Sequence, residues 1–165
     1  MNAHPQFLSP TFDLVAKGLL ALHRLGQAGG DDSPEAEAVR DSLDLPLRAL
    51  SRLEYERSRW LSEDLYSVSE PLVGTYSRAT VPDPSIQQKL LDSTEARQNG
   101  EWDRALELLR DVRDQIAPAL LGCLRGAIWL QAGNFEIAGV FFKHAIGMDL
   151  IEAIAVIGEK RSHTR

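Results

Sequence analysis

The side chains best suited to catalytic or metal chemistry are scattered along this sequence. Its four histidines, His4, His23, His144 and His163, stand far apart, and Cys123 is the only cysteine. The sequence has no glycine-rich phosphate loop, no Cys-x-x-Cys pair and neither the His-Glu-x-x-His nor the Glu-x-x-His spacing that places metal ligands on helices. We therefore expect no catalytic residue, no metal site and no cofactor, and we interpret the chain as a non-enzyme.

Three features that resemble sites have simpler interpretations. The acidic cluster over 31–37 surrounds Ser33-Pro34, a typical helix start, so its carboxylates match the positive end of a helix dipole. We interpret His23 as a solvent-facing or hydrogen-bonded helix residue. Cys123 lies among leucines, and we expect it to be a small buried apolar residue.

Composition and charge limit the possible partners. A hydrophobic fraction of 44% with 25% charged residues is typical of a folded protein. The net charge of −6 argues against binding to nucleic acid, which requires a basic surface. We expect no membrane association, because the apolar run over 12–25 is interrupted by charges and is shorter than the roughly 20 residues of a membrane-spanning helix. With a single cysteine and no secretory signal over 1–9, we expect a cytoplasmic location.

Helical spacing of apolar residues predicts the first elements. We expect helices from Pro10 or Thr11 to the Gly29-Gly30 pair, from Pro34 to about Leu43, and from Ser51 to about Ser67. Pro46 is expected to break the second helix. In the third, Leu53 is assigned to the apolar side together with residues such as Leu61 and Leu65.

A segment rich in proline, serine and threonine divides the sequence. The stretch over 70–84 cannot hold a helix, and it is long for a connection inside a bundle. We interpret residues 1–69 as an N-terminal helical subdomain, 70–84 as a linker or draped loop, and 85–165 as a second region. Whether 70–84 is free or lies in a groove of its own chain remains open.

The second region contains an internal repeat. Gly100-Glu101-Trp102 with Ala105 is echoed 33 residues later by Gly133-Asn134-Phe135 with Ala138. A period near this length indicates stacked helical hairpins, because one hairpin cannot bury its own apolar face. These echoes resemble tetratricopeptide (TPR) repeats, and the resemblance covers about two repeats over roughly 85–149. In the second copy, the family's helix-packing positions are matched by Gly126, Trp129, Phe142 and Ala145.

The sequence also departs from the family pattern. Ser93 stands where a small Gly or Ala is usual, Arg125 stands where a buried Leu is usual, and no proline follows Ala145. We expect helices over 86–98, 102–112, from 118 onward, over 135–146 and over 149–157, the last as a cap. Five aromatic residues are expected at packing positions, namely Trp102, Trp129, Phe135, Phe141 and Phe142, and three polar residues on the solvated face, namely Arg97, Gln98 and Arg125.

The resemblance implies a partner-binding surface on the first helix of each hairpin. Carried over residue by residue, it gives Gln87, Leu90, Thr94 and Arg97 in the first copy, and Leu120, Cys123, Ala127 and Leu130 in the second. The Lys and Asn pair with which some members clamp a terminal carboxylate is absent from these positions. The apolar second set is therefore expected to be covered by other helices or by another subunit.

Together these features predict an all-α fold, with N-terminal helices followed by TPR-like hairpins of an α-α superhelix and a C-terminal capping helix. The leading hypothesis is a non-catalytic scaffold or adaptor that binds a protein or peptide, or a second copy of itself. Two alternatives stay open at this point. One is a small ligand-binding or enzymatic bundle with a pocket between the two helical parts, and the other is a regulatory domain of a larger assembly.

Overall fold

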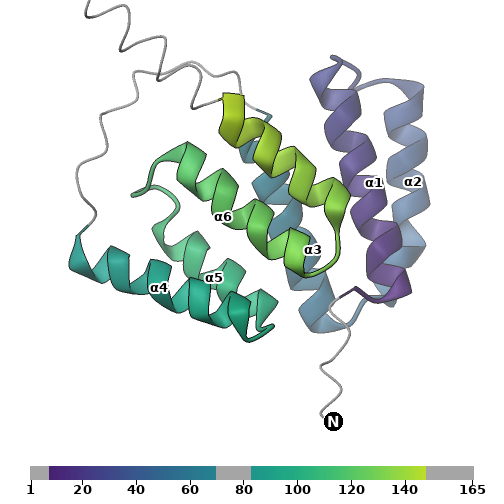
Figure 1. The fold of residues 1–165 in the computed structure, drawn as a ribbon. Helices are drawn as coiled ribbons and strands as arrows, with labels where there is room; N and C mark the ends of the chain where they lie inside the picture. Colours follow the sequence, from purple (N-terminus) through teal and green to yellow (C-terminus); the bar gives the residue numbers. More distant parts are fainter. Residues whose placement is uncertain (1–7, 70–82, 148–165) are drawn as a thin grey trace, which may run out of the picture. The chain divides into compact units, whose positions relative to one another are not determined.

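The computed structural model describes residues 8–69 and 83–147. Within these ranges the chain forms seven helical segments and no strand, which confirms the predicted all-α class. The chain divides into two compact units, Met1–Pro71 and Leu72–Arg165 (Figure 1).

Two predicted elements fall mainly outside these ranges. Of the predicted linker over 70–84, only Asp83 and Pro84 are described, and both belong to the start of a helix. The predicted capping helix over 149–157 lies entirely outside the described residues.

Helix α1 (Pro10–Gln27) begins and ends where its local chemistry predicts. The Ser9 side chain accepts a hydrogen bond from the Phe12 N–H at 3.1 Å, and Pro10 occupies the first turn, where its missing N–H has no intrahelical partner. At the other end the Gly30 N–H donates to the Leu25 carbonyl at 2.8 Å, while Gly29 adopts a φ of 75°, which glycine tolerates without a steric penalty.

Helix α2 (Pro34–Ala49) starts as predicted and ends later than predicted. Ser33 accepts a hydrogen bond from the Ala36 N–H at 3.2 Å, which confirms the capping interpretation of this acidic segment. The predicted break at Pro46 is wrong, because the helix continues to Ala49. Pro46 lies in the last turn, and it removes one N–H donor from the intrahelical hydrogen bonds. Few intrahelical hydrogen bonds follow it, so the helix continues to its end.

Helix α3 (Arg52–Ser67) is fixed by a reciprocal cap. Ser51 accepts a hydrogen bond from the Glu54 N–H at 3.3 Å, and the Glu54 carboxylate accepts one from the Ser51 N–H at 2.8 Å. The Ser9 hydroxyl also donates to Glu54, so one carboxylate links the starts of α1 and α3. The hydrogen bond from the Ser9 hydroxyl has the largest effect on the pKa of Glu54 and lowers it, and the hydrogen bonds from Ser51 lower it further.

The first unit is held together by α1, which packs against both α2 and α3. Gly18 lets α2 approach closely, because a Cβ there would lie 2.4 Å from a methyl carbon of Leu43. On the other side the Arg57 guanidinium lies 5.1 Å from the Phe12 ring centroid. The largest side chains fully buried in this core are Phe12, Val15, Leu20 and Leu61.

One residue predicted for this apolar face lies elsewhere. Leu53 is exposed, which contradicts its assignment to the buried side of α3. In the first turn of α3, Glu54 faces α1 instead, where it accepts the Ser9 hydroxyl. The side of this turn that faces α1 is therefore occupied by the contact between Ser9 and Glu54, and not by Leu53 as the apolar periodicity predicts.

The second unit contains three labelled helices and a fourth helical segment. These are α4 (Pro84–Gln98), α5 (Trp102–Val112), α6 (Pro118–Gln131) and the unlabelled helix over 135–147 (Figure 1). Helix α5 packs against both α4 and α6. Its apolar face buries Ala105, Leu106, Leu109 and Val112.

The turns after α4 and α6 are equivalent. Gly100 and Gly133, 33 residues apart, adopt φ angles of 75° and 94°. The next N–H in each turn closes the helix, from Glu101 to the Ala96 carbonyl and from Asn134 to the Trp129 carbonyl, each at 2.9 Å. The two predicted turn glycines are confirmed. The 33-residue spacing of the sequence repeat is also the spacing of these two main-chain hydrogen bonds.

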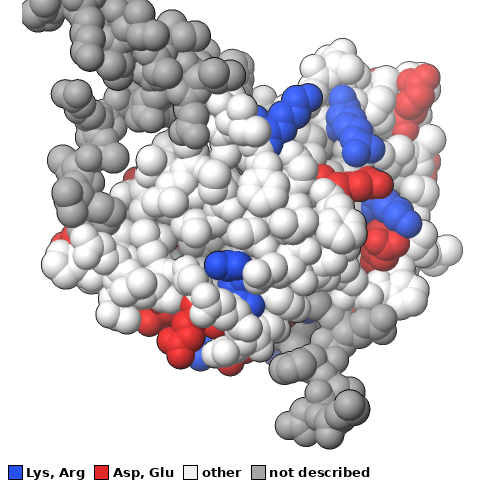
Figure 2. Space-filling view, in the orientation of Figure 1, with Lys and Arg blue, Asp and Glu red and all other residues white. Residues whose placement is uncertain are grey.

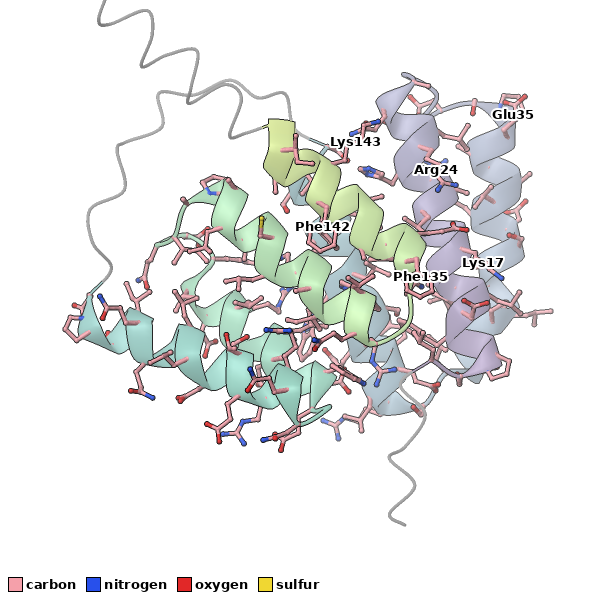
Figure 3. All side chains as sticks on the ribbon, in the orientation of Figure 1. Lys17, Arg24, Glu35, Phe135, Phe142 and Lys143 are labelled. Atoms are coloured by element: carbon pink, nitrogen blue, oxygen red, sulfur yellow. The ribbon has the colours of Figure 1, made fainter. Side chains whose placement is uncertain are left out.

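Small residues let neighbouring helices approach in this unit. The buried Ser93 hydroxyl donates to the Ala105 carbonyl at 2.9 Å, so a serine is accepted where the repeat pattern favours Gly or Ala. In the corresponding place on α6, a Cβ on Gly126 would lie 2.7 to 2.9 Å from three ring carbons of Phe142. Figure 3 labels Phe142 on the side of the 135–147 helix nearest α6.

The sequence predictions for Arg125 and Phe135 in this unit are wrong. Arg125, expected on a solvated face, is only 3% exposed, and its guanidinium lies 5.7 Å from the Phe141 ring centroid. The ring accepts the cation, and the aliphatic stem fills the space expected for Leu. Phe135, expected at a packing position, is 70% exposed at the first residue of its helix, two positions before the buried Ile137 (Figure 3).

Candidate functional site

Helix α6 carries an exposed row of uncharged residues. Leu120, Cys123, Ala127 and Leu130, here called the α6 stripe, are spaced by three, four and three positions. At 100° per residue they fall within an arc of about 80°, and they span about 15 Å along the axis. Leu120 and Leu130 are 41% and 44% exposed, Cys123 is exposed and Ala127 is half-buried.

The opposite side of α6 belongs to the core of the unit. Leu121, Ile128 and Trp129 are buried, and Arg125, the only charged residue of α6, is buried as well. The exposed side of this helix is therefore without charge. Figure 2 shows a broad uncharged area over α6. A surface helix normally presents polar residues to water, so this side of α6 is unusual.

The exposure of Cys123 contradicts the prediction that it is buried. Gly122 takes the buried position instead. A Cβ at Gly122 would lie 3.0 Å from the Phe141 main-chain oxygen and 3.1 Å from the Ala145 Cβ. The absence of a side chain at Gly122 is thus what lets the 135–147 helix approach α6, and the rotation that this contact requires turns Cys123 outward.

The other residues predicted to bind a partner lie on α4. Gln87 is exposed, while Leu90, Thr94 and Arg97 are half-buried. The Thr94 hydroxyl donates to the Leu90 carbonyl of its own helix at 3.0 Å. Of the eight residues that the resemblance gives, four therefore lie on α4, and the other four form the α6 stripe.

The first unit contains a pocket that the sequence did not predict. This N-terminal pocket has a volume of about 380 Å³ and lies between α1, the loop that follows it and α3. It is lined by Leu19, Leu22, His23, Gly26, Asp31, Ser62, Leu65, Tyr66 and Ser69. These residues come from three separate segments and form no linear motif. The signal in the sequence is the helical spacing of those on α1 and of those over 62–69.

Hydrogen bonding links His23 to Ser69 at this pocket. The Ser69 hydroxyl donates to the Leu65 carbonyl at 2.9 Å and also lies 2.9 Å from His23 Nδ1. A hydroxyl can donate one proton and also accept, so Ser69 can bridge His23 Nδ1 and the Leu65 carbonyl. Burial has the largest effect on the pKa of His23 and lowers it, and the neighbouring Arg24 charge lowers it further, which favours a neutral ring.

The contact with the Ser69 hydroxyl gives His23 a side-chain hydrogen-bonding partner. His23 is therefore a hydrogen-bonded helix residue, one of the two alternatives left open by the sequence.

Searches for metal and membrane features gave two negative findings for the described ranges. Across 8–69 and 83–147, no three side chains of His, Cys, Asp or Glu come together as a metal site would require. No helix in the part of the chain that the structure describes is both long and apolar enough to cross a bilayer. Comparisons with protein-family models, with curated proteins and with solved structures found no match to this chain.

Proposed function

We propose that this chain is a non-catalytic scaffold or adaptor of the TPR-like type, and that its α6 stripe binds an amphipathic helix of a protein partner. The observation that carries the proposal is the open, uncharged side of α6, with Leu120 and Leu130 exposed at its two ends. A row of this kind is stabilised when another apolar surface removes it from water.

The spacing of the α6 stripe favours a helix as the partner. Intervals of three, four and three residues are those of the a and d positions in paired helices, where each side chain fits between side chains of the facing helix. An amphipathic helix with apolar residues at the same intervals would cover Leu120 and Leu130 while placing the small Ala127 at the closest approach.

Two further observations support a repeat-type interaction module. The equivalent turns at Gly100 and Gly133 give the second unit a structural period of 33 residues, near that of TPR hairpins. On α4, the exposed Gln87 and the half-buried Arg97 offer polar groups that suit the rim of such an interface. We place this activity in the cytoplasm, where the thiol of Cys123 would stay reduced.

The proposal is tested by selecting helical peptides against the purified chain. A displayed library of amphipathic helices with varied a and d residues is panned on the full chain, and the selected peptides are measured by titration calorimetry. We expect peptides with apolar a and d residues to bind, and Leu130→Glu to weaken binding at least tenfold, because a carboxylate would be buried against them. Leu91→Glu is the matched control, since Leu91 is 64% exposed on α4 and lies outside the stripe.

Cys123 reports directly on whether the stripe is covered. Its exposed thiol reacts with a maleimide in the free chain, and bound peptide should slow that reaction in proportion to occupancy. Light scattering on the free chain identifies a second copy as the partner if the mass doubles and Leu130→Glu restores the monomer. Peptides that bind Leu130→Glu as well as the unmodified chain, with Cys123 still fully reactive, would refute the proposal.

A further inference from the structure

The N-terminal pocket combines an apolar floor with a polar side. Leu19, Leu22 and Leu65 supply the apolar surface, and Leu65 is almost completely buried. The volume of about 380 Å³ lies near the lower end of the range for small-molecule sites, which is roughly 300–1,000 Å³. The pocket therefore suits a compact ligand with one apolar group.

The polar side of the pocket is rich in acceptors. Asp31 contributes a carboxylate, and a neutral His23 ring has one nitrogen that accepts a hydrogen bond. None of the residues that line the pocket is Lys or Arg. A ligand that fits this side must donate hydrogen bonds, and a positive charge on it would be attracted by Asp31.

Main-chain contacts hold Asp31 at this place. The Arg40 Nη2 donates to the Asp31 main-chain oxygen at 2.6 Å, which ties the loop after α1 to α2. The Asp31 carboxylate lies over Gly26, where a Cβ would be only 2.6 Å from Asp31 Oδ1. Gly26 has no positive φ, so its missing side chain matters for the space it leaves to the carboxylate.

The aromatic ring of Tyr66 completes the match. Tyr66 is largely exposed and lines the pocket from α3, one turn after Ser62. An ammonium group near Asp31 can also lie against an aromatic face, which attracts cations. We propose that the N-terminal pocket is a binding site for a small organic amine that carries an apolar group. This site is in the first unit and is independent of the α6 stripe.

The test is an NMR titration of the isotope-labelled full chain with 2-phenylethylamine. We expect saturable shifts of the His23, Gly26 and Leu65 amide signals, with a Kd on the order of a millimolar for a ligand of this size. Two matched probes separate charge from apolar contact. These are 2-phenylethanol, which keeps the ring and loses the cation, and 3-phenylpropionate, which reverses the charge.

Two substitutions locate the site. Asp31→Asn should weaken amine binding about two- to fivefold, the range of an exposed ion pair, while Asp32→Asn, a change of equal charge on the next residue, should leave it unchanged. Gly26→Ala should weaken binding further, because the new methyl group displaces the Asp31 carboxylate and fills part of the pocket. Since alanine favours a helix more than glycine, this variant should fold at least as stably as the parent.

The outcomes decide the proposal. Saturable binding of the amine, weaker binding of the alcohol and loss of binding in Gly26→Ala support it. Equal binding of all three probes would overturn it, because the pocket would then recognise only the phenyl group. No saturable shift at concentrations about tenfold above the expected Kd would also overturn it.

Discussion

Replacing Gly126 by alanine tests a close contact between two helices of the second unit. An alanine Cβ would lie within 2.7 to 2.9 Å of three Phe142 ring carbons, so the ring or the helix must move. Overpacking of this kind costs roughly 1–3 kcal/mol, whereas the change from glycine to alanine inside a helix gains about 1 kcal/mol. We therefore expect Gly126→Ala to lower the free energy of unfolding by about 1 kcal/mol.

Gly139→Ala is the matched control for this substitution. Gly139 lies inside the 135–147 helix, and a Cβ there would have no neighbour within 4 Å. The helix-propensity gain is the same for both variants, so the difference between them isolates the contact with Phe142. We expect Gly139→Ala to be more stable than Gly126→Ala by roughly 1–3 kcal/mol.

The assay is guanidinium unfolding followed by circular dichroism, with equal m-values required for the comparison. The Phe142→Leu background provides the decisive measurement. If the ring causes the loss, Gly126→Ala should cost much less stability after Phe142 is shortened, which gives a coupling energy above about 0.5 kcal/mol. Equal stability of Gly126→Ala and Gly139→Ala, or a coupling energy near zero, would refute the packing described for α6 and the 135–147 helix.

Three further predictions concern the first unit. Ser9→Ala should lower the free energy of unfolding by about 1–2 kcal/mol, because Phe12 and Glu54 both lose a hydrogen bond. Ser42→Ala is the control, because it removes only a bond to the Val39 carbonyl of its own helix. It should change the free energy of unfolding by less than about 0.5 kcal/mol. By NMR titration the pKa of Glu54 should lie below its ordinary value of about 4.3 and rise in Ser9→Ala, and the stability that this carboxylate provides should be lost as the pH falls through its lowered pKa. The pKa of His23 is also lowered in the folded chain, so the unfolded chain binds a proton at this residue more readily than the folded chain does. Stability should therefore fall as the pH drops below about 6.5. In His23→Gln the denaturant midpoint should fall less steeply with decreasing pH.

Local chemistry predicted the helix boundaries because the signals for starting and ending a helix lie within a few residues. Ser9, Ser33 and Ser51 each stand before a helix and each accepts a main-chain N–H. Gly100 and Gly133 each follow one with positive φ. The prediction of a break at Pro46 was wrong, because the effect of a proline depends on how many intrahelical hydrogen bonds follow it. The residue type alone does not specify that number.

Burial was harder to predict because it depends on which neighbour each helix meets. The leucine-rich setting of Cys123 predicted a buried role and the repeat pattern gave Phe135 a packing role, yet both are exposed. The repeat pattern places a buried residue at position 125, where the charge of Arg125 predicts a solvated one, and Arg125 lies buried against Phe141. These outcomes follow from distances between side chains on separate helices, such as the contact of Gly122 with the 135–147 helix, and periodicity within one helix carries no information about them.

The turn that marks the repeat also shows how far local sequence can be taken. The N–H of Gly30 closes α1 on the Leu25 carbonyl as Glu101 and Asn134 close the helices before them, although the first unit shows no 33-residue echo. A glycine turn therefore specifies how a helix ends and not which family it belongs to. What distinguishes the second unit is that equivalent turns recur with equivalent small residues, Ser93 and Gly126, at its helix contacts. The functional hypothesis rests on a different feature, the exposed side of α6. Its residues are not needed to hold the helix in place, because the inward contacts already do so.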